Sequence, residues 1–442
     1  MKISILLPYK ENYSPEYAGA VSIFVNATNK ISKYYKNITV FGFTNFKKKL
    51  STNYKNISLS KKLLKSQSKE YVDKFYETQK KTKPDIIEIH NRPNYIKKLL
   101  ELNTNLVLYF HNDPITMSGS KTTYERLELL ESCSKIIFNS EWSKRQFLKN
   151  LKTFYHKSNK LTVIHQSINK VDIDLKKKEN IITFVGKLNT AKGYDIFGKM
   201  IIKILDKYPK WKSLVIGDEP REKHIFIHKN LKILGFQNHQ KVLNIFKKTS
   251  IAVACSRWEE PFGRTSLEAS SSGCAVIISN RGGLPETVTN GVILGSLSVE
   301  NLYKNISILI KNNKKRRNLQ KLSNENFYLT HEYVSNIIDN YRDSKLQSFK
   351  IFFTKKRKKK LRILHVTNFN ERHDGRLYFN TGRRINNGFI REGHSILEIS
   401  DRDIQKYYKN YKDINGAKTL NSKLKKTCYN YKPDLLVLGH AD

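Results

Sequence analysis

Short, nearly uninterrupted apolar runs alternate along the chain with longer segments in which apolar residues recur at helical spacing. Runs of this kind are typical of strands buried on both faces of a parallel sheet. In the amino-terminal part we predict strands at Ile3–Leu7, Ile38–Phe43, Asp85–His90, Leu106–His111 and Ile136–Asn139. A helical period over residues 21 to 34 separates the first two. The alternation predicts a doubly wound α/β sheet.

The same alternation begins again after the polar stretch at residues 166–180. Further strands are predicted at Ile181–Val185, Ser213–Ile216, Lys232–Leu234, Ile251–Ala254 and Ala275–Ser279, with helices between them. Each half then has an ordinary domain size. We therefore expect a Rossmann-like domain over residues 1–165, a second one over 166–330, and a closing helix at 331–350 that returns to the first domain.

A third, shorter set of elements follows a basic segment at residues 351–360, which contains six consecutive cationic residues from Lys355 to Lys360. Such a run is typical of a solvated linker, and a nucleic-acid or membrane tether is the alternative. Beyond it we predict strands at Leu361–Val366, Ser395–Ile399 and Asp434–Leu438, and a helix at Tyr378–Arg391. Residues 361–442 would form a partial third Rossmann-like unit, which we interpret as truncated because it stops after its last strand.

The net charge of +42, from 81 Lys and Arg against 39 Asp and Glu, should attract polyanions. The basic residues are spread along the chain and are not gathered with aromatic residues, so no nucleic-acid partner is expected. A bias in composition and attraction to an anionic membrane surface both remain open. The four cysteines form no C-x-x-C pair, which argues against a zinc site or a disulfide framework.

No apolar run reaches the length of a membrane span, and the first ten residues lack the features of a signal peptide. The sequence therefore predicts a cytoplasmic protein, with peripheral contact at the inner face of the membrane as a further expectation.

Candidate chemistry lies where two predicted strands of the second half end. Gly186 follows the first strand, and Lys187 and Lys192 flank the loop before the next helix. A glycine turn, cations and a helix N-terminus suit a diphosphate, because each favours close approach of negative charge. From this segment alone, a lysine-rich surface loop is an equal alternative.

The strand at residues 251–254 leads into a Pro/Gly loop and a helix, and two carboxylates, Glu260 and Glu268, lie on either side of the helix start. A loop carboxylate can meet a sugar, and one a turn into the helix can meet a ribose. Backbone N–H groups of the loop can meet phosphate or sugar oxygens. Spacing alone is a weak signal, whereas the whole string EPFGRTSLEA is specific.

Residues 1–347 resemble family 4 of the glycosyltransferases, which are retaining enzymes with two Rossmann-like domains (GT-B). The resemblance rests on the E-x7-E signature, the G-K-L-x-x-x-K-G segment, Gly217-Asp218, and Gly282 to Glu286. The loop Tyr17-Ala18-Gly19-Ala20 resembles the family's glycine-rich first loop. The segments at 87–93 and 110–114 resemble a lipopolysaccharide-type subset.

The resemblance implies an amino-terminal acceptor-side domain, a carboxy-terminal donor domain, and a role for each matched residue. Lys187 and Lys192 would neutralise the donor diphosphate, although the family usually has Arg at the first position. Glu260 would approach the donor sugar and Glu268 the ribose. The backbone N–H groups of Phe262, Gly263 and Arg264 would face the sugar or phosphate. Gly19 would let the first loop approach the diphosphate, and His111 would lie beside the reacting sugar.

The implied activity is metal-independent transfer of a hexose, with retention, from a nucleotide-diphosphate sugar to a glycan or lipid-linked acceptor in lipopolysaccharide or surface polysaccharide synthesis. The nucleotide sugar is a co-substrate, and no cofactor is expected. Residues 361–442 resemble the amino-terminal domain of a second, CgeB-like transferase, on Leu361–Val366 and the loop at 370–376. Alternatives are another GT-B enzyme, such as a sugar-nucleotide epimerase or a phosphorylase, and a charge-driven membrane or nucleic-acid binding protein.

Overall fold

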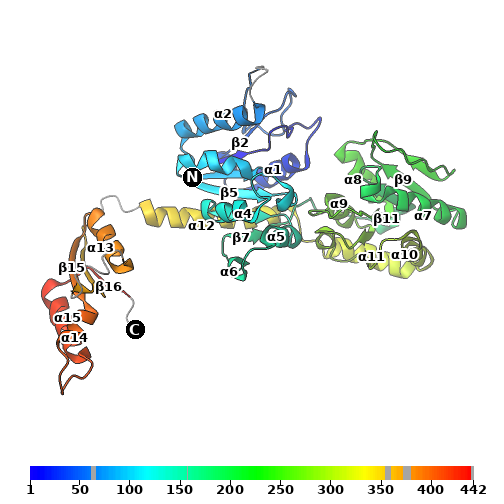
Figure 1. Cartoon of the computed structure of the whole chain (residues 1–442). Coiled ribbons are helices and arrows are strands. Elements are labelled where there is room, and N and C mark those ends of the chain that lie inside the picture. Colours follow the sequence, from blue (N-terminus) through cyan, green and yellow to red (C-terminus); the bar gives the residue numbers. More distant parts are fainter. Residues whose placement is uncertain (61–65, 157, 354–359, 372–379, 440–442) are drawn as a thin grey trace. The chain divides into compact units, whose positions relative to one another are not determined.

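A computed structural model describes residues 1–60, 66–156, 158–353, 360–371 and 380–439, without the side chains of 345–353. The chain divides into two compact units, Met1–Lys345 and Leu346–Asp442. The first unit contains two parallel sheets and the second contains one (Figure 1). The fold class predicted from the apolar pattern, α/β with Rossmann-like units, is confirmed.

The first sheet has seven parallel strands in the order β3-β2-β1-β4-β5-β6-β7. The predicted strands are present as β1 (Ile3–Leu6), β2 (Ile38–Gly42), β4 (Ile86–His90), β5 (Asn105–Phe110) and β6 (Lys135–Phe138). The sequence did not reveal the two edge strands β3 (Tyr54–Asn56) and β7 (Leu161–Val163). Each has three residues, which is too short for a recognisable period.

Helices cover both faces of this sheet, and a separate apolar core lies on each face. These helices are α1 (Ala20–Ile31), α2 (Gln67–Thr82), α3 (Ile96–Leu99), α4 (Thr123–Ser132), α5 (Glu141–Leu148) and α6 (Thr153–His156). Only α1 lies in a region for which a helix was predicted. Helix α4 begins at a capping box, in which Thr122 and Glu125 satisfy each other's backbone N–H groups.

The second sheet has six parallel strands in the order β10-β9-β8-β11-β12-β13. The strands are β8 (Glu179–Val185), β9 (Lys212–Ile216), β10 (Leu231–Ile233), β11 (Thr249–Ala254), β12 (Ala275–Ser279) and β13 (Val292–Leu294). The helices are α7 (Tyr194–Lys207), α8 (His239–Lys248), α9 (Arg264–Ser271), α10 (Val299–Lys311) and α11 (Asn313–Glu325). Strands β8 and β11 are neighbours, so the loops after them lie together at the carboxyl edge.

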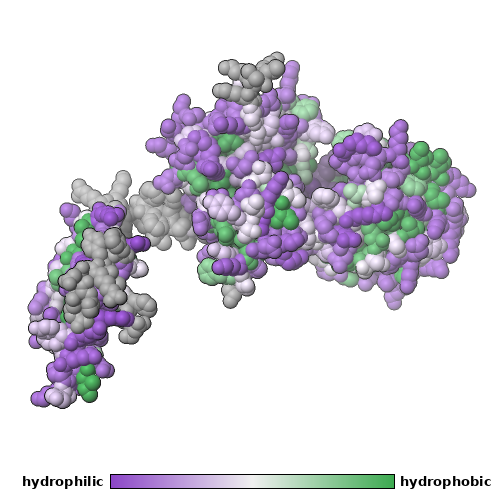
Figure 2. Space-filling view, in the orientation of Figure 1, coloured by the Kyte–Doolittle hydropathy of each residue, from purple (hydrophilic) through white to green (hydrophobic). Residues whose placement is uncertain are grey.

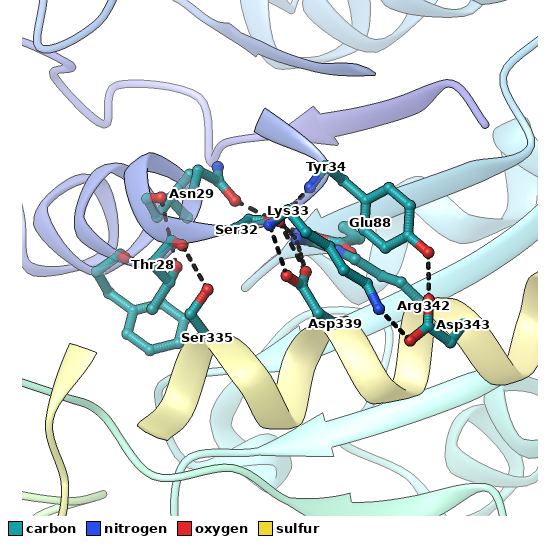
Figure 3. A network of polar contacts seen from close by, with 12 residues as sticks. Thr28, Asn29, Ser32, Lys33, Tyr34, Glu88, Ser335, Asp339, Arg342 and Asp343 are labelled. Atoms are coloured by element: carbon teal, nitrogen blue, oxygen red, sulfur yellow. Dashed lines mark hydrogen bonds and ion pairs between the residues drawn. The ribbon is translucent and has the colours of Figure 1, made fainter. Parts of the chain in front are cut away.

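The helix predicted at 331–350 is present as α12 (His331–Phe353), and it packs on the amino-terminal half. Arg342 of α12 is 2% exposed and donates from Nε and Nη2 to the two oxygens of Glu88 on β4, each at 2.8 Å. It also donates to Asp339 at 3.0 Å. Figure 3 shows these groups meeting Ser32 and Asn29 at the end of α1. A buried polar network therefore ties the last helix of this unit to its first sheet.

The second unit contains three parallel strands in the order β15-β14-β16. The elements are β14 (Arg362–Thr367), α13 (Thr381–Arg391), β15 (Ser395–Ser400), α14 (Asp401–Tyr407), α15 (Ala417–Tyr431) and β16 (Leu435–Leu438). The sequence had not revealed α14 and α15. Three parts of the predictions lie outside the described residues: residues 354–359 of the basic segment, 372–376 of the predicted loop and 378–379 of the predicted helix.

Hydrophilic residues predominate on the face of the surface seen in Figure 2, which agrees with basic residues spread along the chain. None of the helices in the described part of the chain combines the length and the apolar character that a membrane span requires.

Candidate active site

A cavity of about 280 Å³ lies between the two Rossmann-like halves of the first unit. The amino-terminal half contributes residues that follow β5 and β6, together with Ala20 at the start of α1. The carboxy-terminal half contributes the loops after β8 and β11. Seven of the predicted site residues line the cavity: His111, Gly186, Lys192, Glu260, Phe262, Gly263 and Arg264.

The loop after β8 carries one of the two predicted cations into the cavity. Asn189 accepts a hydrogen bond from the backbone N–H of Lys192 at 3.0 Å, which fixes the loop. Gly193 has a φ of 73°, and a Cβ there would lie 1.9 Å from the carbonyl oxygen of Cys255 at the end of β11. Only glycine therefore lets the two loops approach this closely. Lys187 is exposed and does not line the cavity.

The loop after β11 places Glu260 against Lys192, and the two side chains form an ion pair at the cavity wall. The predicted sugar carboxylate and the predicted phosphate cation therefore contact each other. The next residues of this loop contact the amino-terminal half, where Ser140 Oγ donates to the carbonyl oxygen of Pro261 at 2.6 Å. Phe262 is 2% exposed and packs into the core beneath the first sheet. The two halves thus hold this loop from both sides.

Glu268 is 5% exposed and does not line the cavity. Its Oε1 forms an ion pair with Arg264, 3.0 Å from Nε, and a hydrogen bond with His239 Nε2 at 2.9 Å. Arg264 also lines the cavity, and the buried Nη1 of its side chain has no partner among the described residues. The sequence assigned only the backbone N–H of Arg264 to the site and did not single out His239. The contact of Arg264 with Glu268 follows from the helix geometry, which places residues 264 and 268 on one face, whereas His239 comes from α8.

On the amino-terminal side, His111 lines the cavity directly after β5 and is 7% exposed. Burial lowers the pKa of His111 to about 4, so the imidazole is neutral near pH 7. Gly19 does not line the cavity, although the adjacent Ala20 does. A Cβ at Gly19 would lie 2.1 Å from a carboxylate oxygen of Glu11, which accepts the N–H of Ser22 at 3.0 Å. A larger residue at position 19 would therefore have to displace the end of the Glu11 side chain.

A second contact between the two halves centres on Glu286. Its carboxylate accepts the first two N–H groups of α5, from Glu141 at 2.7 Å and Trp142 at 3.0 Å, and it bonds His165 Nε2 at 3.0 Å. Burial alone would raise the pKa of Glu286, but the hydrogen bonds from His165 and these N–H groups hold it below its usual range. The resemblance included Glu286 as part of a motif and gave it no role. Its partners are far away in sequence, so no local pattern could identify them.

Two facing Rossmann-like units with a shared cavity define the GT-B class, and solved structures support this assignment. HepE from Anabaena in complex with UDP-glucose superimposes with a TM-score of 0.61 at 16% identity, covering 78% of this chain and 100% of that one. The lipopolysaccharide outer core galactosyltransferase WaaB in its apo form gives a TM-score of 0.56 at 15% identity, with the same coverage. At these identities the similarity establishes the fold.

Sequence comparison identifies the carboxy-terminal half more closely. Residues 165–325 match the family described as "Glycosyl transferases group 1". Spore coat protein SA of Bacillus subtilis (strain 168) is 23% identical over 358 residues, which cover 73% of this chain and 93% of that protein. The chain therefore contains a glycosyltransferase group 1 domain, and this domain contributes Lys192, Glu260 and Arg264 to the cavity.

Proposed function

We propose that the first unit transfers a hexose, with retention and without a metal, from a nucleotide-diphosphate sugar to a glycan or lipid-linked acceptor. The observation that carries the proposal is the cavity between the two halves, where Lys192, Glu260 and Arg264 lie opposite His111. Cations, a carboxylate and a neutral imidazole are the groups that a sugar diphosphate requires.

A bound diphosphate would replace Glu260 as the ion-pair partner of Lys192. The Glu260 carboxylate would then be free to accept hydrogen bonds from the sugar hydroxyls. Because the ammonium and the carboxylate already lie together, a small side-chain movement exchanges one anionic partner for another. Arg264 adds a second cation beside the start of α9, where backbone N–H groups also favour phosphate. This positive charge would stabilise the leaving diphosphate as the glycosidic bond breaks. Lys187 would join them only after its exposed side chain turned toward the cavity.

Glu268 would bind the ribose with its carboxylate, whose Oε1 contacts Arg264 and His239. Arg264 and His239 both bond Oε1, so they would hold the carboxylate in a fixed orientation. The co-crystallised UDP-glucose of HepE supports a uridine nucleotide as the first donor to test. The similarity to WaaB supports a role in lipopolysaccharide or surface polysaccharide synthesis.

The test is a screen of the full chain against uridine- and guanosine-diphosphate sugars, read by released nucleotide, with and without EDTA. We expect turnover that EDTA does not change, and a released sugar or product with the anomeric configuration of the donor. Loss of activity in EDTA would refute metal independence, and an inverted product would refute retention. Release of nucleotide from none of the donors would refute the proposed function.

Calorimetry on Glu268→Ala tests the ribose contact directly. Loss of hydrogen bonds to a charged group should weaken nucleotide binding roughly 10–100-fold. The exposed carboxylate Glu300 of α10 provides the control, because Glu300→Ala should leave the affinity unchanged. An unchanged affinity in Glu268→Ala would contradict the assignment.

A further inference from the structure

A row of polar and aromatic side chains lies on one face of two neighbouring strands. Side chains two residues apart on a strand share a face, so Glu88 and His90 of β4 lie on one side of the sheet. Strands β4 and β5 are parallel neighbours, and His90 pairs in register with Tyr109. His111 is two residues beyond Tyr109 and continues the row into the cavity.

His90 and His111 form a hydrogen-bonded pair at the end of this row. Nδ1 of His90 lies 2.9 Å from Nε2 of His111. The His90 ring stacks on Tyr109 with a centroid distance of 4.4 Å and an interplanar angle of 12°. Phe24 of α1 contacts the His111 ring edge-on at 5.6 Å. The two imidazoles are 2% and 7% exposed, so packing fixes both ring planes.

The pair carries no net charge near neutral pH. Burial, followed by the neighbouring His111, lowers the pKa of His90 well below its usual range, and burial lowers that of His111 to about 4. A neutral imidazole has one N–H, so a single proton occupies the contact between the rings. The two outer nitrogens, His90 Nε2 and His111 Nδ1, have no partner in the described part of the chain.

We propose that His90 is a positioning residue for His111: its Nδ1–H donates to Nε2 of His111, which fixes the ring and leaves Nδ1–H of His111 as a hydrogen-bond donor for a ligand in the cavity. Either tautomer leaves one outer N–H without a partner among the described residues; His111 lines the cavity, where a ligand can accept it, whereas His90 does not line the cavity. A buried N–H without an acceptor is rarer than an acceptor without a donor. The positive charge of Arg342 near His90 also favours an unprotonated Nε2 in His90.

The consequence for recognition is a neutral N–H donor on the amino-terminal wall of the cavity. Such a donor suits an oxygen of the donor sugar, while the cations of the opposite wall suit the diphosphate. This consequence rests on the proposed function, whereas the arrangement of the two imidazoles does not. The test therefore begins with a measurement that needs no substrate.

Long-range ¹H–¹⁵N spectra of the full chain labelled with ¹⁵N-histidine report the tautomer of each imidazole at pH 7. His90→Phe and His111→Phe assign the two signals. We expect His111 in the Nδ1–H form, with Nε2 as an acceptor, and we expect Nε2–H in His90→Phe. Tyr109→Phe is the matched control, because it retains the ring stacked on His90 and removes a hydroxyl without a partner among the described residues. Nε2–H at His111 in the unmodified protein would overturn the proposal.

Kinetics then tests the functional consequence. An outer partner that orients a functional histidine is typically worth about 10–100-fold, so His90→Phe should lower kcat by that factor and change donor Kd little. The amide of His90→Asn can replace the Nδ1–H donor and should recover most of kcat. Equal losses in both variants, or a loss confined to donor Kd, would refute positioning. An unmodified protein that turns over no nucleotide sugar, but has the expected tautomer, would refute only the proposed function.

Discussion

Replacing Arg342 with Met should lower the free energy of unfolding of the first unit. The loss should be larger than the contribution of an exposed ion pair on the same helix. The guanidinium is 2% exposed and donates to both oxygens of Glu88 and to Asp339. Asp339 retains donors in the variant, from Ser32 Oγ at 2.7 Å and the N–H of Lys33 at 2.9 Å. Glu88, by contrast, is 1% exposed, and within the described residues its hydrogen bonds come from Arg342 alone. Met fills a similar volume and leaves this carboxylate buried and unpaired.

The expected loss is about 3–5 kcal/mol, which is typical when one partner of a buried ion pair is removed. Asp343 provides an internal comparison, because it is also on α12 and pairs with Lys33 in a contact where the lysine side chain is 54% exposed. Pairs of that kind contribute at most about 1 kcal/mol. Asp343→Asn should therefore destabilise the protein far less than Arg342→Met, although both contacts tie α12 to the amino-terminal half.

Urea unfolding followed by tryptophan fluorescence measures the difference in the relevant half. Three tryptophans are present, and Trp142 is the one in the amino-terminal half. In a Trp211→Phe, Trp258→Phe background the emission reports only the region around α5. The midpoint should fall in Arg342→Met and change little in Asp343→Asn, with similar slopes.

A second variant tests the physical cause. In Arg342→Met the orphaned charge is that of Glu88, so adding Glu88→Gln should recover part of the lost stability. A loss below about 1 kcal/mol in Arg342→Met would show that the network contributes no more than an exposed pair. A double variant as unstable as the single one would show that the loss comes from packing and not from the buried charge.

The remaining predictions concern the two walls of the cavity. Arg264→Met should weaken nucleotide-diphosphate binding at least tenfold by calorimetry, while Lys187→Met should change the affinity little. A larger loss of affinity in Lys187→Met than in Arg264→Met would restore Lys187 as the second phosphate cation. Glu286→Gln should lower the free energy of unfolding by about 1 kcal/mol at pH 7, since it weakens the hydrogen bonds to α5. Because the folded-state pKa of Glu286 lies below its ordinary value of 4.5, this contribution is present above pH 4.5 and disappears as pH falls through the lowered value. A difference between the two proteins that grows on acidification would contradict this sign.

The sequence predicts those parts of the fold that depend on the local pattern of apolar and polar residues. Buried parallel strands are continuous apolar runs, so the central strands of both sheets were found. Helix α2 was not predicted, because Lys and Glu dominate its composition, yet Tyr71, Val72, Phe75 and Tyr76 form a buried face at helical spacing. Short edge strands have few buried residues and leave no period to detect.

The candidate site likewise combines features that the sequence predicts with features that it does not predict. The loops after β8 and β11 could be placed together from the rule that parallel strands end at one edge, and the structure brings Lys192 and Glu260 into contact there. The direction of the Lys187 side chain does not follow from that rule. The partners of Glu286 also could not be predicted, because they depend on how the two halves face each other.

The row on β4 and β5 shows what is gained when strand order is added to sequence. Alternation alone places Glu88 with His90, and Tyr109 with His111, but it does not show that the two pairs are neighbours. Once β4 and β5 are known to be adjacent, the two pairs form one row, and Arg342 of α12 reaches its buried end. The cation that pairs with Glu88 also helps to keep His90 neutral, since its charge lowers the pKa of that imidazole. The helix that returns from the carboxy-terminal half thus contributes both to the stability of the first sheet and to the electrostatics of the histidine pair beside the cavity.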